Sequence, residues 1–71
     1  MQISQLAKIL SERVARAGKG ERVTQIHLFG IEYADEIGSA ANQVVAASEI
    51  DNSYATEVRK EMRLAKYVQL R

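Results

Sequence analysis

Residues 39–66 read SAANQVVAASEIDNSYATEVRKEMRLAK, and this stretch decides the fold. Ser39 is a good helix N-cap, and the small and aliphatic residues 40–47 after it predict a helix of about two turns. Residues 48–53 predict a turn, because Ser, Asp and Asn side chains bond nearby backbone amides. A longer helix, capped by a polar residue of that turn, then runs over residues 54–67.

The longer helix has an apolar face, and the turn before it holds an aliphatic anchor. The apolar residues recur at three- and four-residue steps, which places them on one side of the helix. They are Ala55, Val58, Met62 and Ala65, with Leu64 and Val68 at the edges. Ile50 lies in the turn, and we expect its side chain to be buried.

This order of elements resembles the helix-turn-helix of bacterial transcription regulators. That family carries small residues where its two helices cross, an aliphatic anchor in the turn, and Ser or Thr before the recognition helix. The matching residues are Val44, Val45, Ala46, Ala47, Ser48, Ile50, Ser53 and Val58. The family usually has alanine at the place of Val45 and glycine at that of Glu49, so we expect a left-handed or altered turn at Glu49. The whole chain also looks like small bacterial helix-turn-helix-like DNA-binding proteins, a resemblance that names no operator or ligand.

The rest of the chain also predicts helices. Residues 3–17 have one apolar face and end before the Gly18-Lys19-Gly20 break. Residues 24–37 have a broad apolar surface, and Gly30 inside them indicates close approach of another helix. A short strand over residues 25–29 is the competing interpretation. We therefore predict a single all-α domain over residues 1–71, a compact bundle of about four helices with a helix-turn-helix within 39–67.

Charge is distributed unevenly along the 71 residues. Residues 1–22 carry five basic and two acidic side chains, and residues 55–71 carry the same numbers, so each segment has a net charge of +3. Residues 23–54 carry five acidic and no basic ones, a net charge of −5. A polyanion would therefore bind the ends of the chain rather than its middle.

The last helix carries the residue types that read DNA. A recognition helix offers its N-terminal side chains to base edges in the major groove and its basic residues to phosphates. The residues predicted to contact duplex DNA are Asn52, Ser53, Tyr54, Thr56, Arg59, Lys60, Arg63 and Lys66. Glu57 and Glu61 lie among them and would either repel phosphates or pair with Arg and Lys. The competing interpretation of residues 54–66 is a solvated helix with internal ion pairs.

The sequence argues against catalysis. Cysteine is absent, which removes thiol nucleophiles, disulfides and thiolate zinc sites and fits a reducing cytosol. His27 is the single histidine and lies in an apolar segment, so a packed or capping role is expected rather than a catalytic one. We predict no enzyme, no cofactor, no metal, no small-molecule substrate and no membrane span, in a cytoplasmic protein.

The alternative to DNA binding is a protein-interaction or adaptor module without nucleic acid, whose contact surface would be the acidic helix 24–37 or the apolar C-terminus. A third interpretation is a structural subunit of a larger complex. Leu64, Tyr67, Val68 and Leu70 leave more apolar surface than a small monomer should expose. Residues 67–70 also alternate like a short strand, which would pair with a second chain if it did not extend the last helix. We therefore predict a homodimer.

Overall fold

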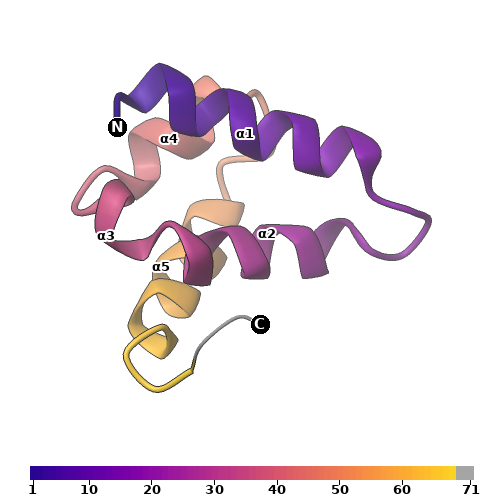
Figure 1. Ribbon diagram of the computed structural model, residues 1–71. Helices are drawn as coiled ribbons and strands as arrows, with labels where there is room; N and C mark the ends of the chain where they lie inside the picture. Colours follow the sequence, from indigo (N-terminus) through magenta and orange to yellow (C-terminus); the bar gives the residue numbers. More distant parts are fainter. Residues whose placement is uncertain (69–71) are drawn as a thin grey trace.

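The computed structural model describes residues 1–68 of the chain and confirms an all-helical fold. Its helices are α1 (Ile3–Arg16), α2 (Arg22–Glu32), α3 (Ala34–Ile37), α4 (Ala41–Ala47) and α5 (Tyr54–Leu64). Figure 1 shows α1 and α4 together at the top, with α2 below them. The last helix, α5, crosses α2 and ends on the side of α2 away from α1 (Figure 1).

Helix α1 forms where its apolar periodicity predicts, over Ile3–Arg16. A capping box opens it, in which the Gln2 backbone N–H donates to Oε1 of Gln5 at 2.8 Å. The buried side chains of its inner face are Leu6, Ala7, Leu10 and Val14. The helix ends one residue before the predicted position, at Arg16.

The single helix predicted over residues 24–37 is wrong, because the chain breaks at Tyr33 into α2 and α3. The Tyr33 backbone lies at φ −108° and ψ 21°, outside the helical region. Its ring packs on Phe29 with centroids 5.3 Å apart, and the Arg13 guanidinium lies 5.3 Å from the ring centre. These contacts hold the side chain at the break. The helix starts at Arg22, so Thr24 is not its first residue, and residues 25–29 are helical rather than a strand.

The predicted helix-turn-helix is α4, a turn and α5, with shifted ends. The N-cap of α4 is Ala40 and not Ser39, because Gly38, at φ 55°, turns the chain before it. Ahead of α5, the Asp51 carboxylate accepts the Ser53 backbone N–H at 2.9 Å. The helix ends at Leu64, earlier than predicted, because residues 66–68 are exposed and no packing supports another turn. For residues 67–70 the sequence left a strand or an extension of the last helix open. Residues 67–68 form neither, and residues 69–70 lie outside the described residues.

The core lies where α1, α2, α4 and α5 meet. Its largest fully buried side chains are Phe29, Leu6, Leu10, Ile26, Ile37, Val44, Val45 and Val58. The most extensive packing is between α2 and α5, followed by that between α1 and α4. A Cβ built on Gly30 would lie 3.0 Å from both the Val58 carbonyl oxygen and the Glu61 Cβ, which confirms the close approach predicted there.

The inward face of α5 differs from the predicted one in its C-terminal half. Ala55 and Val58 are buried as expected, whereas Met62 and Ala65 are only half-buried. Glu61 takes an inward position, with 8% of its surface exposed. The reason is Gly30, whose missing side chain lets the Cβ of Glu61 come close to α2.

Candidate nucleic-acid interface

The turn between α4 and α5 is held by its own side chains and by the core. Glu49 has φ 65°, the left-handed conformation predicted from the missing glycine. The buried Ser48 hydroxyl donates to the Val45 carbonyl at 2.7 Å, and Ile50 packs partly buried against the core. These contacts fix the direction in which α5 leaves the turn.

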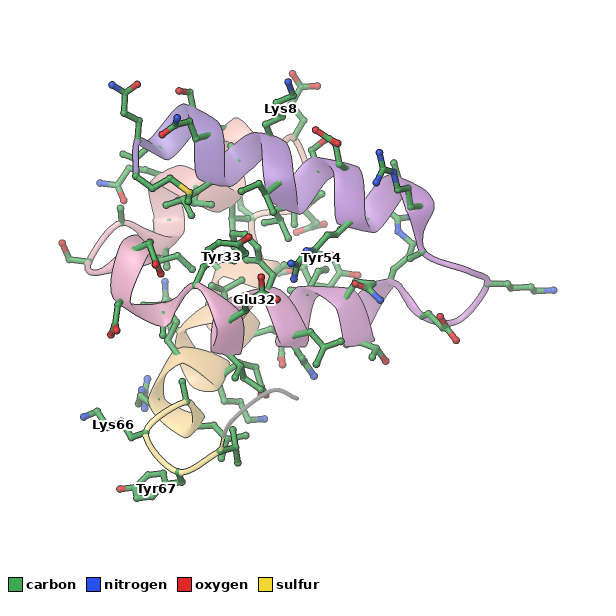
Figure 2. The ribbon with its side chains drawn as sticks, in the orientation of Figure 1. Lys8, Glu32, Tyr33, Tyr54, Lys66 and Tyr67 are labelled. Carbon is green, nitrogen blue, oxygen red and sulfur yellow. The ribbon has the colours of Figure 1, made fainter. Side chains whose placement is uncertain are left out.

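Most of the predicted contact residues lie on the outer face of α5 and the turn before it. Those with exposed side chains are Asn52, Ser53, Thr56, Lys60, Arg63 and Lys66. Arg59 is half-buried, and Tyr54 is half-buried and packs against the core. Figure 2 shows Tyr54 within the body of the molecule, whereas Lys66 projects from the far end of α5. The structure therefore separates Tyr54 from the exposed set.

A polar groove separates α4 from the N-terminal half of α5. It has a volume of about 430 Å³ and is lined by Asn42, Ala46, Asn52, Ala55, Thr56 and Arg59. Within it, Arg59 donates through Nη1 to Oδ1 of Asn42 and through Nη2 to Oγ1 of Thr56, the latter at 3.3 Å. Asn42 was not among the predicted residues, because only the crossing of the two helices brings it to Arg59.

The two glutamates of α5 turn toward α2 rather than toward their basic neighbours. Glu57 Oε2 lies 3.1 Å from Nε2 of His27, and Glu61 Oε1 lies 3.9 Å from its Nδ1. Within residues 1–68, neither glutamate forms an ion pair with Arg or Lys of α5. Of the two alternatives for these glutamates, pairing with Arg or Lys along the helix is therefore not formed. His27 is half-buried between α2 and α5 and contacts both carboxylates.

A second hollow joins acidic and basic residues. It has a volume of about 510 Å³ and lies between the α2–α3 junction and the C-terminal half of α5. Glu32 and Asp35 line it together with Arg59, Arg63 and Lys66. Glu32 also pairs with Arg13 of α1 at 2.8 Å. Acidic residues from the middle of the chain thus lie beside the basic residues near the C-terminal end of α5.

Two side chains near these surfaces have shifted pKa values. The Ser53 backbone N–H, followed by the Ser53 hydroxyl, lowers the pKa of Asp51 by bonding its charged form. Burial, followed by the neighbouring Glu32, raises the pKa of the Tyr33 phenol. Asp51, whose pKa is lowered, lies in the turn that precedes α5.

Over residues 1–68, no three side chains of the His, Asp or Glu type are arranged to hold a metal ion. In the same range every helix is too short or too polar to cross a bilayer.

Comparison with known proteins gives one match. The family model for the HTH-like domain matches residues 2–71. Searches of curated proteins and of solved structures find no match. The family model covers nearly the whole chain, and the structure has the helix order that a helix-turn-helix requires. The chain belongs to the HTH-like domain family.

Proposed function

We propose that this domain binds duplex DNA non-covalently, as a small cytoplasmic transcriptional regulator of bacterial type, with α5 in the major groove. One observation carries the proposal: the exposed charged side chains of α5, Lys60 and Arg63, are both basic, while its two glutamates face His27 of α2. The family supports the same role, because the HTH-like fold is typically non-catalytic and DNA-binding. An α-helix fits the major groove and presents its N-terminal residues to base edges.

The contacts divide into two groups along α5. Asn52, Ser53 and Thr56 lie at its start and are exposed, where they would face bases or nearby phosphates. Lys60, Arg63 and Lys66 lie farther along, and within the described chain none of them has an ion-pair partner. Three phosphate contacts would make log K fall with log salt at a slope of about −3.

The test is binding to a mixed-sequence duplex, measured by fluorescence anisotropy across a salt series. The wild type should bind at low salt and release the duplex as salt rises. Arg59→Ala combined with Arg63→Ala should weaken binding at least tenfold and flatten the salt dependence. If this double variant binds like the wild type, α5 is not the contact face.

A matched control removes two positive charges elsewhere. Lys8 and Lys19 are exposed and, within the described residues, unpaired. Figure 2 shows Lys8 on the opposite side of the molecule from Lys66. Lys8→Ala combined with Lys19→Ala changes the net charge by the same amount and should leave DNA binding within about twofold, since a distant charge is screened.

A second candidate role, contact with another protein chain, rests on the apolar end of α5. Leu64, Tyr67 and Val68 are 43%, 83% and 39% exposed. Tyr67 projects outward from the end of the molecule in Figure 2. We infer that this end joins two copies of the chain. Sedimentation should show a dimer at tens of micromolar that Leu64→Glu dissociates, and a monomeric wild type there would contradict the inference.

A further inference from the structure

We infer that Asn42 of α4 determines DNA sequence preference by positioning Arg59 of α5. The inference rests on the proposed DNA binding and adds a residue from outside the recognition helix. Its basis is the pair of hydrogen bonds that the Arg59 guanidinium makes in the groove between α4 and α5. Asn42 itself is exposed and belongs to the first helix of the helix-turn-helix.

The two hydrogen bonds hold the guanidinium from two directions. Nη1 donates to Asn42, on the other helix, and Nη2 donates to Thr56, one turn earlier on α5. A guanidinium has five N–H donors in one plane, so three remain for another partner. Because the plane is held at two nitrogens, these three donors keep a fixed direction relative to α5.

A fixed direction matters most when an arginine reads a base. Arginine recognises guanine through two parallel N–H donors to O6 and N7, and this geometry separates guanine from the other bases. A free arginine must lose rotamer freedom when it forms these bonds, whereas a held one has already lost much of it. A phosphate contact tolerates many directions, so positioning would contribute little there.

Asn42 also opposes a second attraction that acts on Arg59. The same side chain lines the hollow on its other side, where Glu32 and Asp35 lie. Without the Asn42 amide oxygen, these carboxylates become the strongest attraction for the guanidinium. Loss of Asn42 should therefore move Arg59 away from the α4–α5 groove and from the N-terminal part of α5.

The experiment selects bound sequences from a randomised duplex library and then measures affinity for the selected duplex and for each single-base change. Wild type, Asn42→Ala, Arg59→Ala and the double variant are compared. We expect Arg59→Ala and Asn42→Ala to lose preference at the same base pair, with discrimination there falling about tenfold. The double variant should lose no more than Arg59→Ala alone, because the two residues act as one unit.

Two further variants separate positioning from other effects. Gln43→Ala removes the neighbouring exposed amide on α4 and should leave the preference unchanged. Asn42→Asp keeps an oxygen acceptor for Arg59, so it should retain the preferred base pair. Its negative charge should lower affinity for every duplex. The salt slope of Asn42→Ala should equal that of the wild type, because no charge is removed.

Several results would overturn the inference. An unchanged preference in Asn42→Ala would do so while leaving the proposed function standing. The inference would also fail if Asn42→Ala caused the same loss of base preference in the wild type and in Arg59→Ala, since Asn42 would then contact DNA itself. The inference would fail as well if Asn42→Asp lost as much base preference as Asn42→Ala. If the wild type binds no duplex at all, both the inference and the proposed function fail.

Discussion

The two flanks of α5 carry opposite charges and have different surroundings. On the flank toward α2, Glu57 and Glu61 lie beside His27, and Glu61 is buried. On the outer face, Lys60 and Arg63 are exposed and, within residues 1–68, unpaired. A helix of mixed charge can therefore still present a basic surface. The net charge of +1 therefore understates the positive charge of the face that α5 offers.

The flank toward α2 depends on a glycine that lets the two helices approach. A Cβ on Gly30 would lie 3.0 Å from the Val58 carbonyl oxygen and from the Cβ of Glu61. The carbonyl belongs to the backbone of α5, so it moves only with the whole helix. Gly30 is therefore the position at which a substitution would most strongly separate α5 from α2.

The largest effect is expected from Gly30→Val. The added side chain overlaps the α5 backbone, and overpacking of a core costs about 1–3 kcal/mol. We expect the free energy of unfolding, measured by urea denaturation, to fall by about 2 kcal/mol or more. Glycine in a helix already costs about 1 kcal/mol relative to alanine, so propensity alone predicts the opposite sign.

Gly18→Val is the matched control for this change. Gly18 is exposed, and the nearest atom to a Cβ there is Oε2 of Glu21 at 3.7 Å. Its free energy of unfolding should stay within about 0.5 kcal/mol of the wild type. Equal effects at the two glycines would mean that the close approach of α2 and α5 is not a stabilising contact.

The sequence predicted this fold from local patterns and missed what depends on helix crossings. The apolar steps of residues 3–17, the glycine at position 30 and the turn around Ile50 all have short-range signals, and the structure bears them out. The side chain at the break, Tyr33, contacts Arg13, twenty positions earlier, and a local pattern does not show such a contact. The ends of α4 and α5 shifted for the same kind of reason, since packing rather than propensity decides them.

The candidate site was predictable in its residue types but not in their pairing. Arg59, Arg63 and Lys66 are among the residues that the sequence predicted to contact DNA, and all three line one hollow. For Glu57 and Glu61 the sequence left two alternatives, repulsion of phosphates or pairing with basic neighbours, whereas both face His27, thirty or more positions away. Asn42 had no signal, because its partner lies on a different helix.

The charge difference between the two flanks of α5 predicts an intermediate effect, on affinity for duplex DNA. Lys60→Gln removes a charge from the outer face, so it should weaken duplex binding by about tenfold and lower the salt slope by about one. Glu57→Gln removes a charge from the flank toward α2 and should change affinity by less than threefold. Anisotropy titrations of the two variants under identical salt measure both. A large gain in affinity for Glu57→Gln would show that this carboxylate faces DNA.

The smallest effect is expected at Asp51, in the turn that leads into α5. Its folded-state pKa is lowered, first by the Ser53 backbone N–H, so its stabilising contribution is present above the unfolded pKa. That contribution is lost as pH falls through the folded-state pKa. Asp51→Ala should therefore unfold more easily than the wild type at neutral pH, and the difference should shrink below about pH 4.

The control for Asp51→Ala is its neighbour Asn52, which is exposed. Thermal melts of Asn52→Ala and of the wild type should show a difference that does not vary between pH 7 and pH 3. A constant difference for Asp51→Ala over the same range would contradict the role given to its carboxylate.

The order in which the helices pair has a consequence for how the chain acquires its structure. The most extensive packing joins α2 to α5 and α1 to α4, so each pair brings together segments that are far apart in sequence. The helices α4 and α5 of the helix-turn-helix thus pack more extensively on α1 and α2 than on each other. An excised peptide spanning residues 39–67 would lose both partner surfaces and remain unfolded. The domain should therefore fold in a single cooperative step, with no autonomous subunit inside it.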